Sequence, residues 1–92
     1  MKNYKAIYQA PFLKNLKKLI RKDFSLKKRI DGFFQKLLST PFYPALKTHK
    51  VESRYGKVFS SRLSNDIRVL WKFSDKETIL IFDIGSHDEI YS

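Results

Sequence analysis

Three apolar runs follow one another at hairpin spacing over residues 57–85, and this spacing limits the possible folds more than any other feature. The runs read KVFSSRLS, IRVLWKFS and TILIFDIG, and the joints between them are the short segments ND and DKE. Short runs with alternating polarity predict strands, and joints of two or three residues connect antiparallel neighbours. We therefore expect an antiparallel meander of three strands, over residues 57–64, 67–74 and 78–85.

The segment before the meander contains two different periodicities. Residues 3–10, NYKAIYQA, alternate in polarity and predict a short strand that ends at a proline. From Phe12 to about Asp23 the apolar residues recur with helical spacing. A second helix, capped by Ser25, is expected to end before Pro41. Two helices joined so closely fold back as a hairpin.

Residues 41–56 contain two prolines and no sustained period, so we interpret them as an ordered surface loop. The resulting order is β-α-α-β-β-β in a single domain, residues 1–92. We predict an α+β fold in which the helix hairpin packs on one face of a mainly antiparallel, twisted sheet.

The middle run of the meander separates apolar from basic residues. Alternation places Ile67, Val69, Trp71 and Phe73 on one face and Arg68, Leu70 and Lys72 on the other. We expect the first face, including Trp71, to pack under the helices as core. The second face, which also carries Arg62 from the preceding run, is expected to be open.

Charge is polarised along the chain, whose formal net charge is +10. Residues 1–57 hold 15 Lys and Arg against 3 Asp and Glu, whereas residues 58–92 hold 4 against 6. A basic surface of this kind favours a polyanionic partner, either nucleic acid or an acidic protein. Part of the excess lies on helix faces that must be polar in any case, so charge alone does not exclude a solubilising surface.

Several function classes lack their sequence signatures. The chain has no cysteine, which excludes disulfides, thiolate nucleophiles and cysteine-ligated zinc and fits a reducing cytoplasm. Its opening, MKNYKAIYQAP, lacks the apolar core of a signal peptide, and no run is long enough to cross a bilayer. We expect a cytoplasmic protein without a membrane partner.

Cofactor and metal signatures are missing as well. The sequence contains no glycine-rich phosphate loop, no helix with paired histidines and no Gly-x-Ser-x-Gly turn. A metal site from His49, His87, Asp88 and Glu89 is conceivable, but metal clusters usually show closer and more regular spacing. We predict no cofactor and no metal.

The remaining polar residues suit metal-free RNA cleavage. This reaction needs a base for the 2′-hydroxyl proton, a cation for the anionic phosphorane and an acid for the leaving 5′-oxygen. Histidine can act as base or acid near neutral pH, and arginine binds phosphate oxygens. Candidates that could meet at the open face and its adjoining loop are His49, Arg62, Arg68, His87 and Tyr91, with Lys47 and Lys50.

Each candidate also has a purely structural interpretation. His49 stands among lysines and could be a solvated surface residue, and the arginines could be solubilising. The tail after the last strand, however, has no packing reason to carry His87 and Tyr91. We expect Gly85 to release the chain there so that both turn toward the basic face.

The order of elements, the segment KVFSSRLSNDIRVLWKFSDKETILIFDIGSHDEIY and the closing Gly-x-His-x-x-x-aromatic pattern resemble the RelE/ParE superfamily of bacterial toxins. The similarity covers almost the whole chain and is greatest to the RelE/StbE and YafQ-type mRNA interferases. It implies the toxin of a type II toxin–antitoxin system. Such a toxin is an endoribonuclease that cleaves mRNA in the decoding site of the small ribosomal subunit and has a cognate antitoxin as its partner.

The resemblance also assigns residues one at a time. The terminal histidine of the YafQ-like motif falls on His87, its following aromatic residue on Tyr91, and the family's loop histidine on His49. An acid after the second strand falls on Asp66. Arg62 stands where YafQ-like toxins carry a histidine and is similar to the arginine at the active face of RelE.

These correspondences imply roles in catalysis. His87 is the favoured acid, either His49 or His87 is the base, and Arg62 stabilises the charge of the transition state. Residues expected to bind substrate are Lys47, Lys50, Arg54 and Arg68.

Two alternatives share the fold. ParE-type toxins poison gyrase and are not nucleases, and a non-catalytic RNA- or protein-binding module is the third possibility. ParE-type toxins generally lack the terminal histidine pattern, so GSHDEIY favours the nuclease.

Overall fold

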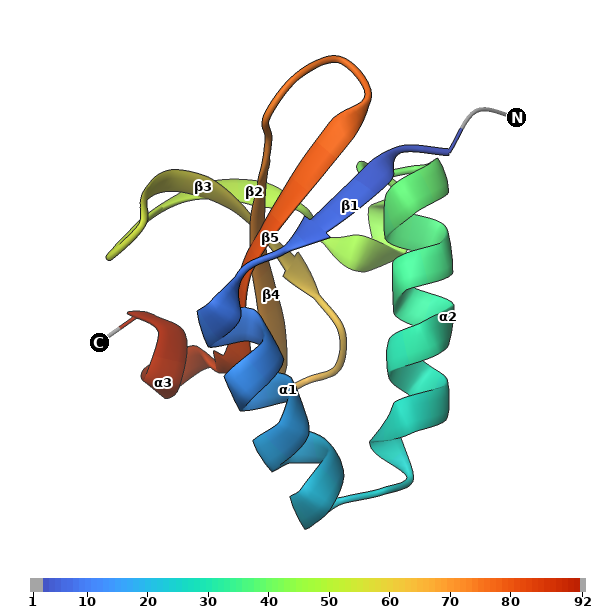
Figure 1. Cartoon of the computed structure of the whole chain (residues 1–92), viewed down its shortest axis with the longest axis vertical. Coiled ribbons are helices and arrows are strands. Elements are labelled where there is room, and N and C mark those ends of the chain that lie inside the picture. The colour runs from blue at the N-terminus through green and yellow to red at the C-terminus, as the bar shows by residue number, and fades with distance from the viewer. Residues whose placement is uncertain (1–2, 92) are drawn as a thin grey trace.

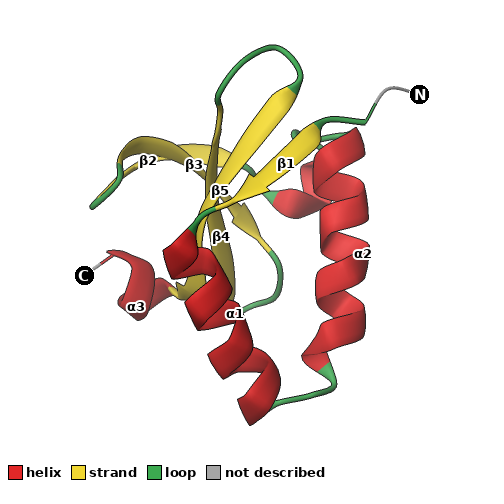
Figure 2. Cartoon of the chain, in the orientation of Figure 1, coloured by secondary structure: helices red, strands yellow, loops and turns green. Residues whose placement is uncertain are grey.

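The computed structural model describes residues 3–91. Two long helices cover one face of a twisted five-stranded sheet, and a short helix follows the last strand (Figures 1 and 2). The elements are β1 (Lys5–Tyr8), α1 (Ala10–Lys22), α2 (Leu26–Ser39), the 3-10 helix η1 (Pro44–Leu46), β2 (His49–Ser53), β3 (Gly56–Arg62), β4 (Ile67–Phe73), β5 (Thr78–Ser86) and α3 (His87–Tyr91).

The strands lie in the order β1-β5-β4-β3-β2. β1 runs parallel to β5, and every other neighbouring pair is antiparallel. The predicted α+β class, with a helix pair on one face of a mainly antiparallel sheet, is confirmed. The observed order is β-α-α-β-β-β-β with a short terminal helix, one strand more than we predicted.

The additional strand is β2, which lies in the segment predicted to be a surface loop. β2 pairs with β3 so that His49 faces Ser60 and Ser53 faces Gly56. Its sequence, HKVES, brings only Val51 against apolar neighbours, and an edge strand of this kind shows no hydrophobic alternation. The prediction of a loop is therefore wrong at residues 49–53, and His49 is carried by a strand.

The helices begin and end close to the predicted positions. α1 starts two residues earlier than expected, because Pro11 occupies its first turn, where a missing N–H costs no hydrogen bond. Ser25 precedes α2 as predicted, but its hydroxyl does not cap the helix. Instead, the backbone N–H and the hydroxyl of Ser25 donate to Asp23 Oδ1, at 3.1 and 2.5 Å. Within residues 3–91, no helix combines the length and apolar character needed to span a membrane.

The main core lies between the helix pair and the sheet. Trp71, in β4, is fully buried, and its indole Nε1 donates to Ser61 Oγ at 2.8 Å. Phe12 of α1 and Phe34 of α2 meet edge to face, with ring centroids 5.6 Å apart. Trp71 is a core residue, as its place in the alternation predicted.

The opposite face of the sheet is not open, contrary to our expectation. A second apolar cluster forms there around Val58, Leu70 and Ile90, with Tyr55 and Phe82 packed against it. The tail folds into α3 and buries Ile90, which is 2% exposed. The basic residues that we expected to share this face therefore lie around an apolar cluster that α3 covers.

Candidate active site

One pocket gathers four of the residues that the sequence singled out. It has a volume of about 440 Å³ and is lined by His49 and Val51 of β2, Arg68 of β4, and His87 and Tyr91 of α3. These elements are brought together because the β2–β3 hairpin and α3 both pack on the second apolar cluster. The tertiary structure thus places both histidines of the chain at one site.

His49 has one ring nitrogen fixed by the backbone. Its Nδ1 lies 2.8 Å from the carbonyl oxygen of Lys47. A carbonyl oxygen can only accept a hydrogen bond, so Nδ1 must carry a proton. In the neutral ring, Nε2 is then the nitrogen with the free lone pair, which is the form that a general base requires.

His87 lies at the first position of α3 and is 68% exposed. Its ring meets the ring of Tyr91 edge to face, with centroids 4.5 Å apart. When protonated, it forms an ion pair with Asp88, whose Oδ1 is 3.7 Å from His87 Nδ1. The hydroxyl of Tyr91 is hydrogen-bonded to Ser60 Oγ on β3, so the ring that supports His87 is itself held by the sheet.

A capping box holds α3 in place. The backbone N–H of Ser86 donates to Glu89 Oε1 at 2.9 Å, and the backbone N–H of Glu89 donates to Ser86 Oγ at 3.2 Å. The hydrogen bond from the Ser86 backbone lowers the pKa of the Glu89 carboxyl below its usual value. The Ser-x-x-Glu spacing of SHDE is the sequence signal for this capping box, in which Glu89 has a structural role that our prediction did not include.

Gly85 has a different function from the one we predicted. The chain is not released there, because β5 continues through Gly85 to Ser86. A Cβ atom at Gly85 would lie 3.3 Å from Glu89 Oε1 and 3.4 Å from Ile90 Cγ1. The glycine therefore allows α3 to pack closely against the end of β5.

The two arginines are paired across β3 and β4 but have different surroundings. Arg68 lines the pocket, and its Nη1 donates to the carbonyl oxygens of Ser64 at 2.7 Å and Asn65 at 3.2 Å. A guanidinium has five N–H donors, so these bonds orient it and leave donors for a ligand. Arg62 is opposite Arg68 in the sheet, but its Nη2 is hydrogen-bonded to Asn65 Oδ1 and it does not line the pocket.

The remaining predicted site residues are dispersed. Asp66 lies exposed in the turn between β3 and β4 and does not line the pocket, and Lys47 and Lys50 are exposed neighbours of His49. Arg54 donates to the carbonyl oxygen of Glu89 at 3.3 Å. It lines a separate pocket of about 420 Å³ that also includes two lysines of α1, Lys18 and Lys22.

The β2–β3 hairpin is fastened by a buried carboxylate that sequence reasoning missed. Asp83 of β5 is 5% exposed and accepts hydrogen bonds from Tyr55 Oη and Asn15 Nδ2, each at 2.7 Å. Burial and the bond to Asp83 raise the pKa of Tyr55 to about 12. No local pattern marks this contact, because its members come from a hairpin turn, a strand and a helix.

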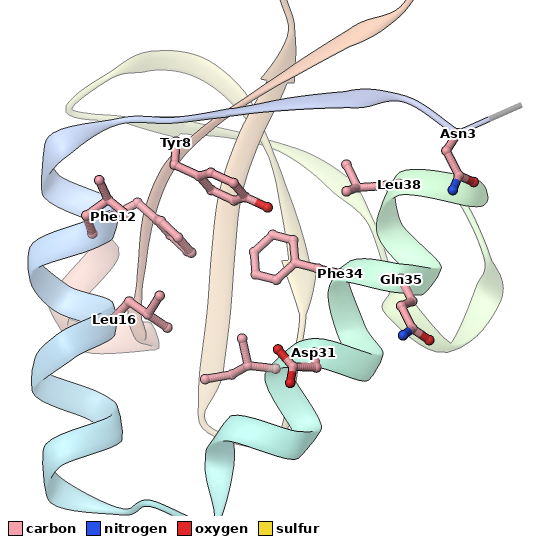
Figure 3. A pocket seen from close by; sticks show the side chains of 10 residues that line it. Asn3, Tyr8, Phe12, Leu16, Asp31, Phe34, Gln35 and Leu38 are labelled. Carbon is pink, nitrogen blue, oxygen red and sulfur yellow. The ribbon is translucent and has the colours of Figure 1, made fainter.

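A further pocket is a groove between α1 and α2, with a volume of about 830 Å³ (Figure 3). Phe12, Leu16 and Phe34 point into it, and Asp31 lies at its lower end in the view. Within residues 3–91, no group of three or more histidine and acidic side chains is arranged to hold a metal ion.

Comparison with solved structures shows what the fold is similar to. A metal-bound toxin from Helicobacter pylori is 24% identical, with a TM-score of 0.76 over 94% of this chain and 97% of the other. A chain of the E. coli DinJ-YafQ toxin-antitoxin complex is 14% identical, with a TM-score of 0.78 over 98% and 99% of the two chains. The YoeB/ParE toxin from Agrobacterium tumefaciens is 14% identical, with a TM-score of 0.73 over 90% and 98%.

No protein-family model and no curated protein sequence matches the chain. At these identities the structural similarity concerns the fold, and the fold is the one expected from the resemblance of the sequence.

Proposed function

We propose that this chain, which has the fold of the YafQ and YoeB/ParE toxins, is the toxin of a type II toxin–antitoxin pair. Its activity is endonucleolytic cleavage of mRNA on the ribosome, without a metal ion. The observation that carries this proposal is the meeting of His49, His87 and Arg68 in one open pocket. Base, acid and cation are the three groups that cleavage by a 2′-hydroxyl requires.

The hydrogen bond to Lys47 favours His49 as the base in this proposal. His49 Nε2 takes the proton of the 2′-hydroxyl, and the 2′-oxygen attacks the adjacent phosphorus. His87, in its protonated form, gives a proton to the 5′-oxygen as the phosphorus–oxygen bond breaks. The products are a 2′,3′-cyclic phosphate and a 5′-hydroxyl end, and the two imidazoles have exchanged their protonation states.

Arg68 is the first candidate for stabilising the phosphorane. It lines the pocket, and the turn carbonyls fix its guanidinium. Arg62, which lies outside the pocket, is the candidate for binding a flanking phosphate. Lys47 and Lys50 are exposed beside His49 and can bind RNA phosphates there, whereas Arg54 lines the separate pocket with Lys18 and Lys22. Tyr91 offers an aromatic surface beside His87 for a splayed base. Asp66, in the exposed turn, is outside the set that we assign to the reacting groups.

The groove between the helices is our candidate for the antitoxin contact. Its lining includes Tyr8 and Leu13, which are 42% and 45% exposed. An exposed apolar groove on so small a chain is typical of a protein-binding surface. Lys14 and Lys17 lie beside Leu13 on α1, so an acidic, amphipathic segment would fit the groove in both polarity and charge.

The nuclease activity is tested by mapping RNA ends after induced expression. We expect growth arrest, mRNA cuts spaced by codons, and fragments ending in 2′,3′-cyclic phosphate. His87→Ala should lower the cleavage rate about 10²- to 10⁴-fold. Lys76→Ala, in the turn at the other end of β4, is the matched control. Undiminished cleavage by the His87 variant would contradict the proposal.

A parallel assay separates the two alternatives that share the fold. Loss of DNA supercoiling with intact mRNA would indicate a gyrase poison. RNA binding without cleavage or arrest would indicate a non-catalytic module. The nuclease proposal requires cut mRNA and normal supercoiling.

The antitoxin contact is tested with the product of the neighbouring small gene. Co-expression should relieve the arrest caused by the wild-type chain. Leu13→Glu should prevent this relief, because it places a charge in the groove. Phe24→Glu, at the exposed turn between the helices, is the control. Co-expression should still relieve the growth arrest that this variant causes.

A further inference from the structure

Among residues 3–91, Lys47 is the one residue other than glycine with a positive φ. Its φ of 50° and ψ of 39° lie in the left-handed helical region, which is unfavourable for residues with a Cβ atom. Such a conformation persists only where the surrounding structure enforces it, and it often marks a functional site. Lys47 stands two positions before His49.

The residues on both sides hold Lys47 in this conformation. Its backbone N–H closes the 3-10 helix by donating to the carbonyl oxygen of Pro44 at 3.1 Å. On the following side, Thr48 Oγ1 donates to the carbonyl oxygen of Pro41 at 2.7 Å and lies 2.6 Å from Ser61 Oγ. Ser61 in turn accepts the indole N–H of the buried Trp71. The turn is therefore anchored to the core through Thr48.

The reversed backbone direction at Lys47 brings its carbonyl oxygen to His49 Nδ1. We propose that Lys47 is a positioning residue whose left-handed backbone, rather than its ammonium group, holds His49 as the Nδ1–H tautomer. Nε2 is thereby kept unprotonated in the neutral ring and available as a base. The consequence for catalysis rests on the proposed nuclease function, whereas the tautomer itself does not.

The test compares two substitutions that both remove the ammonium group. Lys47→Gly adopts the left-handed conformation without strain, whereas Lys47→Val is β-branched and strongly disfavours it. Long-range proton–nitrogen NMR spectra of the His49 ring, recorded where the ring is neutral, report which nitrogen carries the proton. We expect the Nδ1–H form in the wild type and in Lys47→Gly, and a mixture of tautomers in Lys47→Val.

The cleavage rates should follow the tautomer. We expect kcat for Lys47→Val to be about tenfold or more below that of Lys47→Gly, because the base is then partly in the wrong form. The indole signal of Trp71 and the amide dispersion show whether each variant is folded. If Lys47→Val does not fold, the wild-type and Lys47→Gly spectra still show whether His49 keeps its proton on Nδ1 without the ammonium group of Lys47.

Two results would overturn the inference. One is an Nε2–H ring in the wild type or in folded Lys47→Gly. The other is the same tautomer and the same kcat in both folded variants. If the Nδ1–H tautomer is found in a chain that cleaves no mRNA, the inference about Lys47 stands and the proposed function fails.

Discussion

Arg62 and Arg68 face each other across β3 and β4, and their surroundings give them different roles. Arg68 lines the pocket and is oriented by three backbone carbonyl groups, including those of Ser64 and Ile67. Arg62 is hydrogen-bonded to Asn65 and lies outside the pocket. A guanidinium fixed before substrate binds loses little entropy when the transition state forms.

This difference predicts unequal effects of one substitution at two neighbouring positions. Arg68→Gln should lower kcat about 10²- to 10³-fold, because a preorganised donor to the phosphorane is lost. Arg62→Gln should cost much less and should act mainly on KM. Single-turnover cleavage of mRNA on purified ribosomes measures both. If Arg62→Gln lowers kcat more than Arg68→Gln does, Arg62 and not Arg68 stabilises the charge of the transition state.

At the scale of elements, α2 contains a glycine that no contact requires. A Cβ atom at Gly32 would meet no other atom within 4 Å, whereas Gly56, the first residue of β3, has a φ of +87°. Gly32→Ala should raise the free energy of unfolding by about 0.5–1 kcal/mol, because alanine has the higher helix propensity. Gly56→Ala should lower it by about 1 kcal/mol. Urea denaturation measures both changes, and a destabilised Gly32→Ala would contradict this account of α2.

The capping box makes the docking of α3 dependent on pH. Because the pKa of Glu89 is lowered in the folded chain, its carboxylate stabilises α3 fully above the pKa of the unfolded chain. This stabilisation is lost as pH falls through the lower, folded value. Glu89 is exposed, so solvent screening should keep the effect below about 1 kcal/mol.

Hydrogen exchange of the α3 amides should therefore accelerate in acid in the wild type. Glu89→Gln retains a side-chain acceptor for the Ser86 amide and removes the titration, so its exchange should depend less on pH in this range. A wild-type acid dependence equal to that of the Gln variant would exclude the capping box as the cause.

At the scale of the whole molecule, the contact of Asp83 with Tyr55 and Asn15 joins β5, the β2–β3 hairpin and α1. Tyr55→Phe should lower the free energy of unfolding by about 0.5–1.5 kcal/mol, because one net hydrogen bond is lost. Asp83→Ala should cost more, since it leaves two side-chain donors and the backbone N–H of Ile84 without this acceptor. Chemical denaturation with Tyr43→Phe as an exposed control measures these differences.

The same contact predicts an alkaline limit of stability. The pKa of Tyr55 is raised from 10.0 to about 12, so its contribution is fully present below pH 10 and is lost as pH rises to about 12. In the Tyr55→Phe variant, the free energy of unfolding should not show this part of the decrease between pH 10 and about 12. An identical decline in wild type and variant would exclude Tyr55 as its source.

Much of the architecture follows from local pattern. The alternation over residues 57–85 and the helical spacing of α1 and α2 specify which faces are apolar, because each element must bury its apolar side. β2 was not predictable in this way. Its polar residues are stabilised by pairing with β3, and such pairing leaves no hydrophobic period in the sequence.

The sequence by itself determined the fold class, the burial of Trp71 and the residue types of the candidate site, because these depend on periodicity and on side-chain chemistry. Tertiary structure decided which of the candidates meet. His49 and Arg68 join His87 because the β2–β3 hairpin and α3 both pack on the second apolar cluster, whereas Arg62 and Asp66 lie outside the pocket. These contacts link distant segments, and only packing of the whole chain brings them together.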